Sequence, residues 1–102
     1  MFIIKLSYKV PLSEVDKYLQ THREFLDTYY KKGLLLVSGP MNPRTGGIII
    51  ALSKDKDTVI TIFQQDPYYL ADIAEYEFIE FNPVKYGDEI KELIQKMEGN
   101  LC

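Results

Sequence analysis

The chain of 102 residues carries 12 Lys and Arg residues against 15 Asp and Glu residues, which gives a formal net charge of −3 at pH 7. This length predicts one domain that spans residues 1–102. Because the charge is acidic and the lysines are spread along the sequence, the basic patch that phosphate-backbone binding requires is missing, and we expect no nucleic-acid partner.

The rarest residues exclude further kinds of chemistry. The sequence has one His, one Cys and no Trp. A single cysteine cannot close a disulfide within the chain, and the terminal position of Cys102 predicts an incidental thiol in a reducing, cytoplasmic setting. One His and one Cys cannot supply the roughly four ligands of a His/Cys zinc site. A carboxylate-only metal site stays open but without support, because Asp55 and Asp57 lack the glycine and glutamate of a calcium loop. We expect no metal and no bound cofactor. No apolar stretch approaches the roughly 20 residues of a membrane span, and we expect no membrane partner.

Hydrophobic periodicity predicts the first two elements. Residues 2–8 alternate in polarity as a strand does. Ser13 is a typical helix N-cap, and the residues after it recur at helical spacing: Val15, Leu19, His22, Leu26 and Tyr29. Gly33 follows two lysines, which predicts the end of this helix.

Two short apolar strands are expected next. Residues 34–38 are apolar and are closed by Gly39 and Pro40, which predict a turn. Residues 46–52 form a second apolar run that begins with glycine. The simplest interpretation is a pair of neighbouring antiparallel strands.

The second half of the chain predicts a crossover helix, a short helix, a strand and a tail helix. The β-branched residues 58–62 favour a strand by propensity, but the polar start at residues 53–57 and the position between strands favour a helix. Asp66 before proline is a typical N-cap for a short second helix. Residues 76–81 alternate as a final strand, and residues 87–98 carry one apolar stripe of a surface helix.

This order predicts an α+β, ferredoxin-like βαββαβ fold with a four-stranded antiparallel sheet and helices on one face. We expect residues 86–102 to form a C-terminal helical extension to it. The strands at residues 34–37 and 48–52 are apolar on both sides, whereas a sheet with one face in water alternates. We therefore expect a homodimer formed sheet to sheet, with the tail helix assisting.

The strongest candidates for chemistry are a histidine and an aspartate. His22 lies within the apolar stripe of its helix, where it is either a satisfied core histidine or a general acid or base. Asp66 either caps its helix only or also orients His22. The fold order places both on the same side of the sheet, so contact between them is plausible.

Weaker candidates surround the second and third strands. Ser38, Gly39 and Pro40 serve a turn in any case, but a hydroxyl beside bare amides also suits an oxyanion, and the glycines at 46 and 47 suit it with less support. Tyr68 is either a packing residue or part of a pocket wall. Arg44, in the loop, is either solvated or clamps an acidic ligand.

Short motifs occur in the order and spacing of a known family, over residues 1–86: His22 with Phe25 and Leu26, Gly33 and Leu34, Ser38 to Pro40, Gly47, Asp66 to Tyr68, and Tyr76 and Glu77 ahead of Pro83. The chain thus resembles the YciI-like (YCII-related) family. The resemblance implies a dimer of the dimeric α+β barrel superfamily and an active site on His22 and Asp66, with Ser38 close to the cleft. Members of the wider group look like enzymes that act on small, often aromatic-derived rings, such as dehydrochlorinases and muconolactone isomerases.

Two functional hypotheses follow. In the first, a cofactor-independent isomerase, lyase or hydrolase uses His22 and Asp66 for acid–base chemistry on a small cyclic or anionic metabolite, which binds near Ser38, Gly39, Pro40 and Tyr68. In the second, a non-catalytic dimeric module binds a small molecule in the same cleft, and the His/Asp pair is structural.

Overall fold

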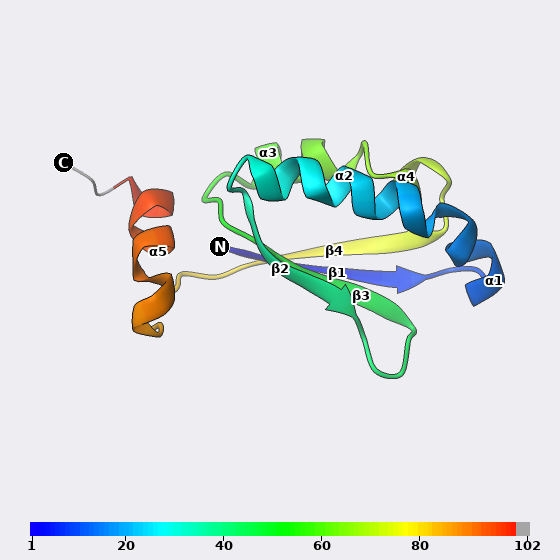
Figure 1. Ribbon diagram of the computed structural model, residues 1–102, viewed down its shortest axis with the longest axis horizontal. Coiled ribbons are helices and arrows are strands. Elements are labelled where there is room, and N and C mark those ends of the chain that lie inside the picture. Colours follow the sequence, from blue (N-terminus) through cyan, green and yellow to red (C-terminus); the bar gives the residue numbers. More distant parts are fainter. Residues whose placement is uncertain (100–102) are drawn as a thin grey trace.

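Four strands form one antiparallel sheet in the computed structural model, which describes residues 1–99 (Figure 1). The strands are β1 (Phe2–Tyr8), β2 (Leu35–Pro40), β3 (Gly46–Ala51) and β4 (Ala74–Glu80). Their order across the sheet is β2-β3-β1-β4, and each neighbouring pair is antiparallel. This order is that of two interleaved βαβ units, so the predicted α+β fold with a four-stranded antiparallel sheet is confirmed.

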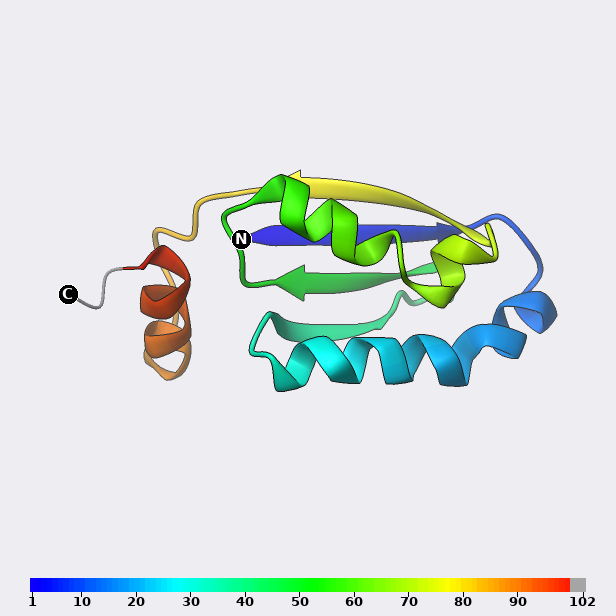
Figure 2. The same cartoon turned by 90° about the horizontal axis from the view of Figure 1, so that it is seen from above.

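The helices that complete these units cover one face of the sheet (Figures 1 and 2). Helix α2 lies beside β2, whereas α3 and α4 lie above the half of the sheet that contains β4. The helical elements are α1 (Leu12–Val15), the 3₁₀ turn η1 (Asp16–Tyr18), α2 (Leu19–Lys31), α3 (Lys56–Phe63), α4 (Pro67–Leu70), the 3₁₀ turn η2 (Asp88–Ile90) and α5 (Lys91–Glu98).

The crossover helix and the Asp66 cap are as the sequence predicts, and the cap of α3 falls within its predicted polar start at residues 53–57. Asp55 caps α3 by accepting hydrogen bonds from the backbone N–H groups of Asp57 and Thr58. Asp66 caps α4, with Pro67 at the first helical position. Helix α3 forms in spite of its β-branched residues because it buries Val59 and Phe63 against the sheet, and this tertiary packing outweighs a weak propensity.

Two local predictions are wrong. Ser13 is not an N-cap, because the carbonyl of Pro11 accepts from the next turn and the helix begins at Leu12. Gly39 and Pro40 form no turn but the end of β2, paired with residues 48 and 47 of β3. Proline is tolerated there because β2 is an edge strand, where a missing N–H need not break the ladder.

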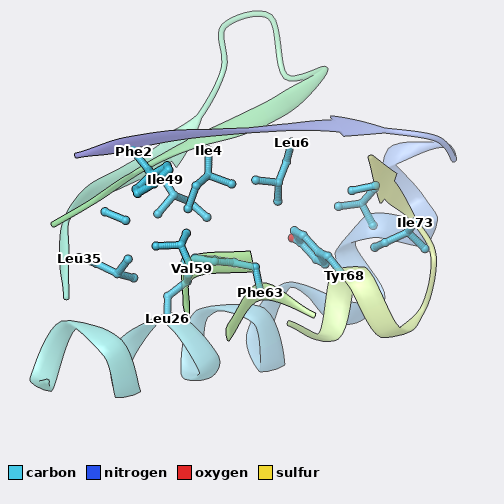
Figure 3. Packing of buried hydrophobic residues seen from close by; sticks show 13 residues of the cluster. Phe2, Ile4, Leu6, Leu26, Leu35, Ile49, Val59, Phe63, Tyr68 and Ile73 are labelled. Carbon is cyan, nitrogen blue, oxygen red and sulfur yellow. The ribbon is translucent and has the colours of Figure 1, made fainter. Parts of the chain in front are cut away.

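The main core lies between the helices and the sheet, and Figure 3 shows its side chains meeting there. Every second residue of β1 contributes to it, because alternate side chains of a strand point to the same face. Its buried members are Phe2, Ile4, Leu6, Val15, Leu26, Leu35, Ile49, Ala51, Val59, Phe63, Tyr68, Ile73 and Ala74. This core fixes α2 and α4 relative to each other.

The opposite face of the sheet carries an apolar row, which the notably apolar strands predict. The register aligns Val37 with Ile50, Ile50 with Ile3, and Ile3 with Ile79, so one such residue comes from each strand. Val37 is 54% exposed and Ile79 is 42% exposed. Ile50 packs against the cluster that contains Ile94 of α5, whereas α2, α3 and α4 lie on the other face of the sheet (Figures 1 and 2).

Helix α5 packs at the end of the sheet and confirms the predicted tail helix. Its Ile94 is buried with Met1 and Leu52 in a second apolar cluster. Helix α5 therefore covers an end of the sheet and leaves most of the open face without a helix. Cys102 lies outside the described residues.

Candidate active site

His22 lies on the buried side of α2, one turn before Leu26, and is 8% exposed. Its Nδ1 is 2.7 Å from Oδ1 of Asp66, which comes from the other side of the core. The plausible contact between these two residues is therefore present. Since Nδ1 is engaged, Nε2 is the ring nitrogen that remains for a ligand.

Asp66 is fully buried, and three donors surround its carboxylate. Oδ1 accepts from the backbone N–H of Tyr68 at 3.0 Å as well as from His22, and Oδ2 accepts from the hydroxyl of Tyr76 at 2.6 Å. A buried charge is tolerated when such donors satisfy it. Asp66 thus caps α4 and contacts His22 at once, so it does more than cap its helix.

Tyr76 is a member of this network that the sequence reasoning missed as a site residue. It lies on β4, whose alternation directs it toward the helices. Burial, and secondarily the adjacent Asp66 carboxylate, raises the pKa of Tyr76 far above the ordinary value for tyrosine. The hydroxyl therefore stays protonated at neutral pH and remains a donor to Asp66. The alternation of β4 was the available signal, but the pairing with Asp66 depends on the tertiary fold.

Tyr68 fixes the orientation of the imidazole. Its ring stacks on that of His22 with a centroid distance of 3.9 Å and an interplanar angle of 7°. Burial raises the pKa of Tyr68 to about 12, so its hydroxyl is protonated at neutral pH. Among the described residues, this hydroxyl is the one buried side-chain polar atom without a hydrogen-bond partner. Figure 3 shows it pointing into the space between helices and sheet.

A cavity of about 430 Å³ lies against His22. This volume falls within the usual range for small-molecule sites, roughly 300–1,000 Å³. The cavity is lined by Leu6 and Tyr8 of β1, by Leu19, His22, Arg23 and Leu26 of α2, by Ser38, Gly39 and Pro40 of β2, by Arg44, by Gly47, Ile48 and Ile49 of β3, and by Tyr68. The structure thus brings all the sequence candidates except Asp66 and Gly46 to one cavity, and the buried Asp66 contacts His22 at its wall.

The β2 candidates take a different local form from the predicted turn. Ser38 faces the helices, where its Oγ lies 2.6 Å from the hydroxyl of Tyr30 on α2. Gly46 is structural, because a Cβ there would lie 1.8 Å from the backbone oxygen of Leu6. Gly47 lines the cavity. The expected turn is therefore absent at Gly39, which pairs with Ile48 of β3.

Two arginines enter the cavity wall, one of which the sequence reasoning did not single out. Arg44 donates to Asp16 Oδ1 at 2.6 Å and lies 5.9 Å from the ring of Tyr8. The hydrogen bond to Asp16 raises the pKa of Arg44, which is positively charged in any case. Arg23 follows His22 directly on α2. Arg44 therefore bonds a carboxylate of its own chain and also lines the cavity.

A second cavity, of about 680 Å³, is lined in part by Tyr76, Phe63, Tyr69 and Phe78. It is the larger of the two, but it contains none of the predicted site residues. Within residues 1–99 there is no cluster of three or more His, Cys, Asp and Glu side chains suited to a metal ion. In the same range, the helices are too short or too polar to cross a membrane.

The geometry combines a histidine, a carboxylate and an adjacent cavity. A neutral imidazole held through Nδ1–H can accept a proton at Nε2, and the resulting cation is stabilised by the carboxylate. The stacked Tyr68 and the bond to Asp66 restrain the ring, so this arrangement is suited to move a proton.

Comparison with known proteins agrees with the fold. The family model of the YCII-related domain matches residues 1–82. Among solved structures, the chain is similar to 5-chloro-2-hydroxyhydroquinone dehydrochlorinase (TftG) from Burkholderia phenoliruptrix AC1100, in complex with 2,5-dihydroxybenzoquinone. The TM-score is 0.67 and the identity 19%, over 87% of this chain and 98% of that chain. No curated protein sequence matches.

Proposed function

The chain belongs to the YCII-related domain family, and on that premise we propose that it is a small-molecule enzyme in which His22 performs general acid–base chemistry. The observation that carries this proposal is the 2.7 Å contact between the chain's one histidine and the fully buried Asp66, at the wall of a cavity. A histidine that only filled the core would need no cavity beside it.

The proposed proton path uses both ring nitrogens. The Nδ1–H group donates to Asp66, which fixes the tautomer that leaves Nε2 basic. Nε2 accepts a proton from the substrate or, in a hydrolysis, from the attacking water molecule, and the imidazolium forms a charged pair with Asp66. His22 then returns the proton to another position of the substrate or to a leaving group. This sequence serves an isomerisation, an elimination or a hydrolysis.

The cavity supports a small cyclic substrate. Its walls are mainly apolar, and we assign Ser38, Gly39, Pro40 and Tyr68 to substrate binding because they line it together with His22. The dehydrochlorinase that shares the fold is in complex with 2,5-dihydroxybenzoquinone, a planar six-membered ring. A ring of that size is compatible with a volume of about 430 Å³.

The test begins with a thermal-shift screen of small cyclic acids and alcohols, followed by turnover assays on the compounds that stabilise the protein. We expect His22→Gln to lower kcat by roughly 10²- to 10⁴-fold with little change in ligand affinity, because general acid–base catalysis contributes that much. Lys17→Gln, on the surface beside Glu14, is the control that should leave kcat unchanged. Unchanged kcat in the folded His22→Gln variant would reject catalysis and support the binding-module alternative.

The second part of the proposal is that two copies of the chain pair through their sheets. The apolar row of Val37, Ile50, Ile3 and Ile79 crosses all four strands on the face opposite α2, α3 and α4. A second copy of the same face supplies a matching apolar surface, as a two-fold interface requires. The next row, which contains the Lys5–Glu77 pair, places opposite charges beside the apolar row.

Sedimentation velocity at micromolar concentration tests this pairing. The wild-type chain should sediment as a dimer, and Ile79→Lys should sediment as a monomer, because it buries a charge in the apolar row. Glu75→Lys is the control and should remain dimeric. Glu75 lies on the same face, two residues before Glu77 on β4. A wild-type monomer at that concentration would contradict the proposed dimer.

A further inference from the structure

The cavity beside His22 collects the arginines of the chain. Of the 12 basic residues only two, Arg23 and Arg44, are arginines, and both line this cavity. No lysine of the described residues lines it. Arginine differs from lysine in its planar fork of N–H donors, which matches a carboxylate in a two-pronged arrangement. Because both arginines lie at one cavity, the cavity is suited to bind a carboxylate, which the net charge of the chain alone would not indicate.

Arg44 is held in place before any ligand arrives. Asp16 accepts a hydrogen bond from one terminal nitrogen at 2.6 Å, and the guanidinium lies over the ring of Tyr8 at 5.9 Å. A guanidinium has five N–H donors, so one bond to Asp16 leaves donors for a ligand. Because its rotamer is already restricted, less side-chain entropy is lost when it binds.

Arg23 supplies a charge without a partner. Among the described residues, no carboxylate lies within ion-pair distance of it. Arg23 follows His22 directly on α2 and lies about one helical turn before Leu26, and all three residues line the cavity. Within residues 1–99 no Asp or Glu side chain lines the cavity, so Arg23 is free of an ion pair and available to an anionic ligand there, while Arg44 shares its charge with Asp16.

Most of the rest of the wall is apolar. Leu6 and Ile49 of the sheet and Leu19 and Leu26 of α2 line the cavity from two sides. We propose that Arg23 and Arg44 bind the carboxylate of a small cyclic substrate, whose apolar ring lies between these leucine and isoleucine side chains with its reacting atom at His22. This inference rests on the proposed function and narrows its substrate class to cyclic carboxylic acids.

Binding of benzoate tests the inference without any turnover. Amide chemical shifts of Gly39 and Gly47, which line the cavity, report occupancy during an NMR titration. Benzamide has the same ring and shape without the charge and serves as the matched ligand. We expect benzoate to bind at least about tenfold more tightly than benzamide, since a charge-assisted hydrogen bond discriminates by this factor or more. The benzoate affinity should fall as salt is added.

The arginine variants identify the groups responsible. Arg44→Gln and Arg23→Gln should each weaken benzoate binding by about tenfold and leave benzamide binding unchanged. Lys17→Gln removes the same charge from the surface without touching the cavity and should change neither affinity. Equal affinity for the two ligands, absence of saturable benzoate binding, or benzoate binding that survives both arginine substitutions would overturn the inference.

His22→Gln separates this inference from the proposed function. The variant should still bind benzoate, because the carboxylate contacts the arginines. If benzoate binding depends on the arginines but no substrate is turned over, the anion site stands and the catalytic proposal fails. If His22→Gln abolishes turnover but the arginine variants bind benzoate normally, the catalytic proposal stands and the anion site is wrong.

Discussion

Asp66→Asn is the substitution that probes the buried network most sharply, because it keeps the shape of the side chain and its ability to cap α4. Asparagine is as good an N-cap as aspartate. The substitution removes the negative charge and replaces one acceptor oxygen with an amide nitrogen. This nitrogen faces the Tyr76 hydroxyl, which must then accept a hydrogen bond instead of donating one.

The magnitude follows from the three hydrogen bonds that the carboxylate accepts. A hydrogen bond to a charged group contributes about 1.5–3 kcal/mol to stability and a neutral one about 1 kcal/mol. Each of the three bonds therefore contributes roughly 0.5–2 kcal/mol less in the variant. Part of this loss is offset because a charge no longer has to be buried. We expect Asp66→Asn to lower the free energy of unfolding by about 2–4 kcal/mol.

Urea denaturation followed by circular dichroism at pH 7.5 measures this loss. The matched control is Asp55→Asn, because Asp55 is the N-cap of α3, also accepts from backbone N–H groups, and is exposed. The control should leave the denaturation midpoint unchanged. If the two variants lost the same stability, Asp66 would be an ordinary helix cap and the network described around His22 would contribute nothing.

Three further outcomes are expected. Tyr76→Phe should lower the free energy of unfolding by about 1.5–3 kcal/mol, since it removes a donor from the buried Asp66 carboxylate; a urea melt that matches the wild type would contradict this. Tyr68 keeps its proton to about pH 12 when folded but loses it near pH 10 when unfolded, so the folded state binds more protons between these values and stability falls as pH rises, by up to about 1.4 kcal/mol per pH unit. Tyr68→Phe should flatten this alkaline decline, and an unchanged slope would show that the hydroxyl is not buried. Gly46→Ala should cost at least about 2 kcal/mol in a urea melt because its Cβ would meet the Leu6 backbone, and a neutral effect would refute that close approach.

The order of the elements could be predicted from the sequence because each has a local signal. Alternation marks β1, and helical spacing marks α2. Even α3, whose β-branched residues favour a strand, was predictable from the position between two strands, because a crossover is needed there. The errors at Ser13 and at Gly39 with Pro40 have one cause. Residue types that favour caps or turns show where a chain can change direction. A helix or strand can nevertheless continue through them.

The pairing of His22 with Asp66 could also be foreseen in outline, because the fold order brings their helices to one face of the sheet. The contribution of Tyr76 was not foreseen, because its contact with Asp66 depends on the register of β4 and the position of α4. The two arginines that line the cavity were harder still to predict from the sequence. Arg23 lies next to a buried residue on a helix, and Arg44 is on a loop whose path no periodicity describes.

The central claim is that Asp66 holds His22 with its proton on Nδ1 and leaves Nε2 as the base. Since the chain has one histidine, the long-range ¹H–¹⁵N NMR spectrum of the imidazole needs no assignment by mutation. We predict that the neutral ring shows a protonated Nδ1 and an unprotonated Nε2, and that Asp66→Asn weakens this preference. A neutral wild-type ring with its proton on Nε2 would contradict the account.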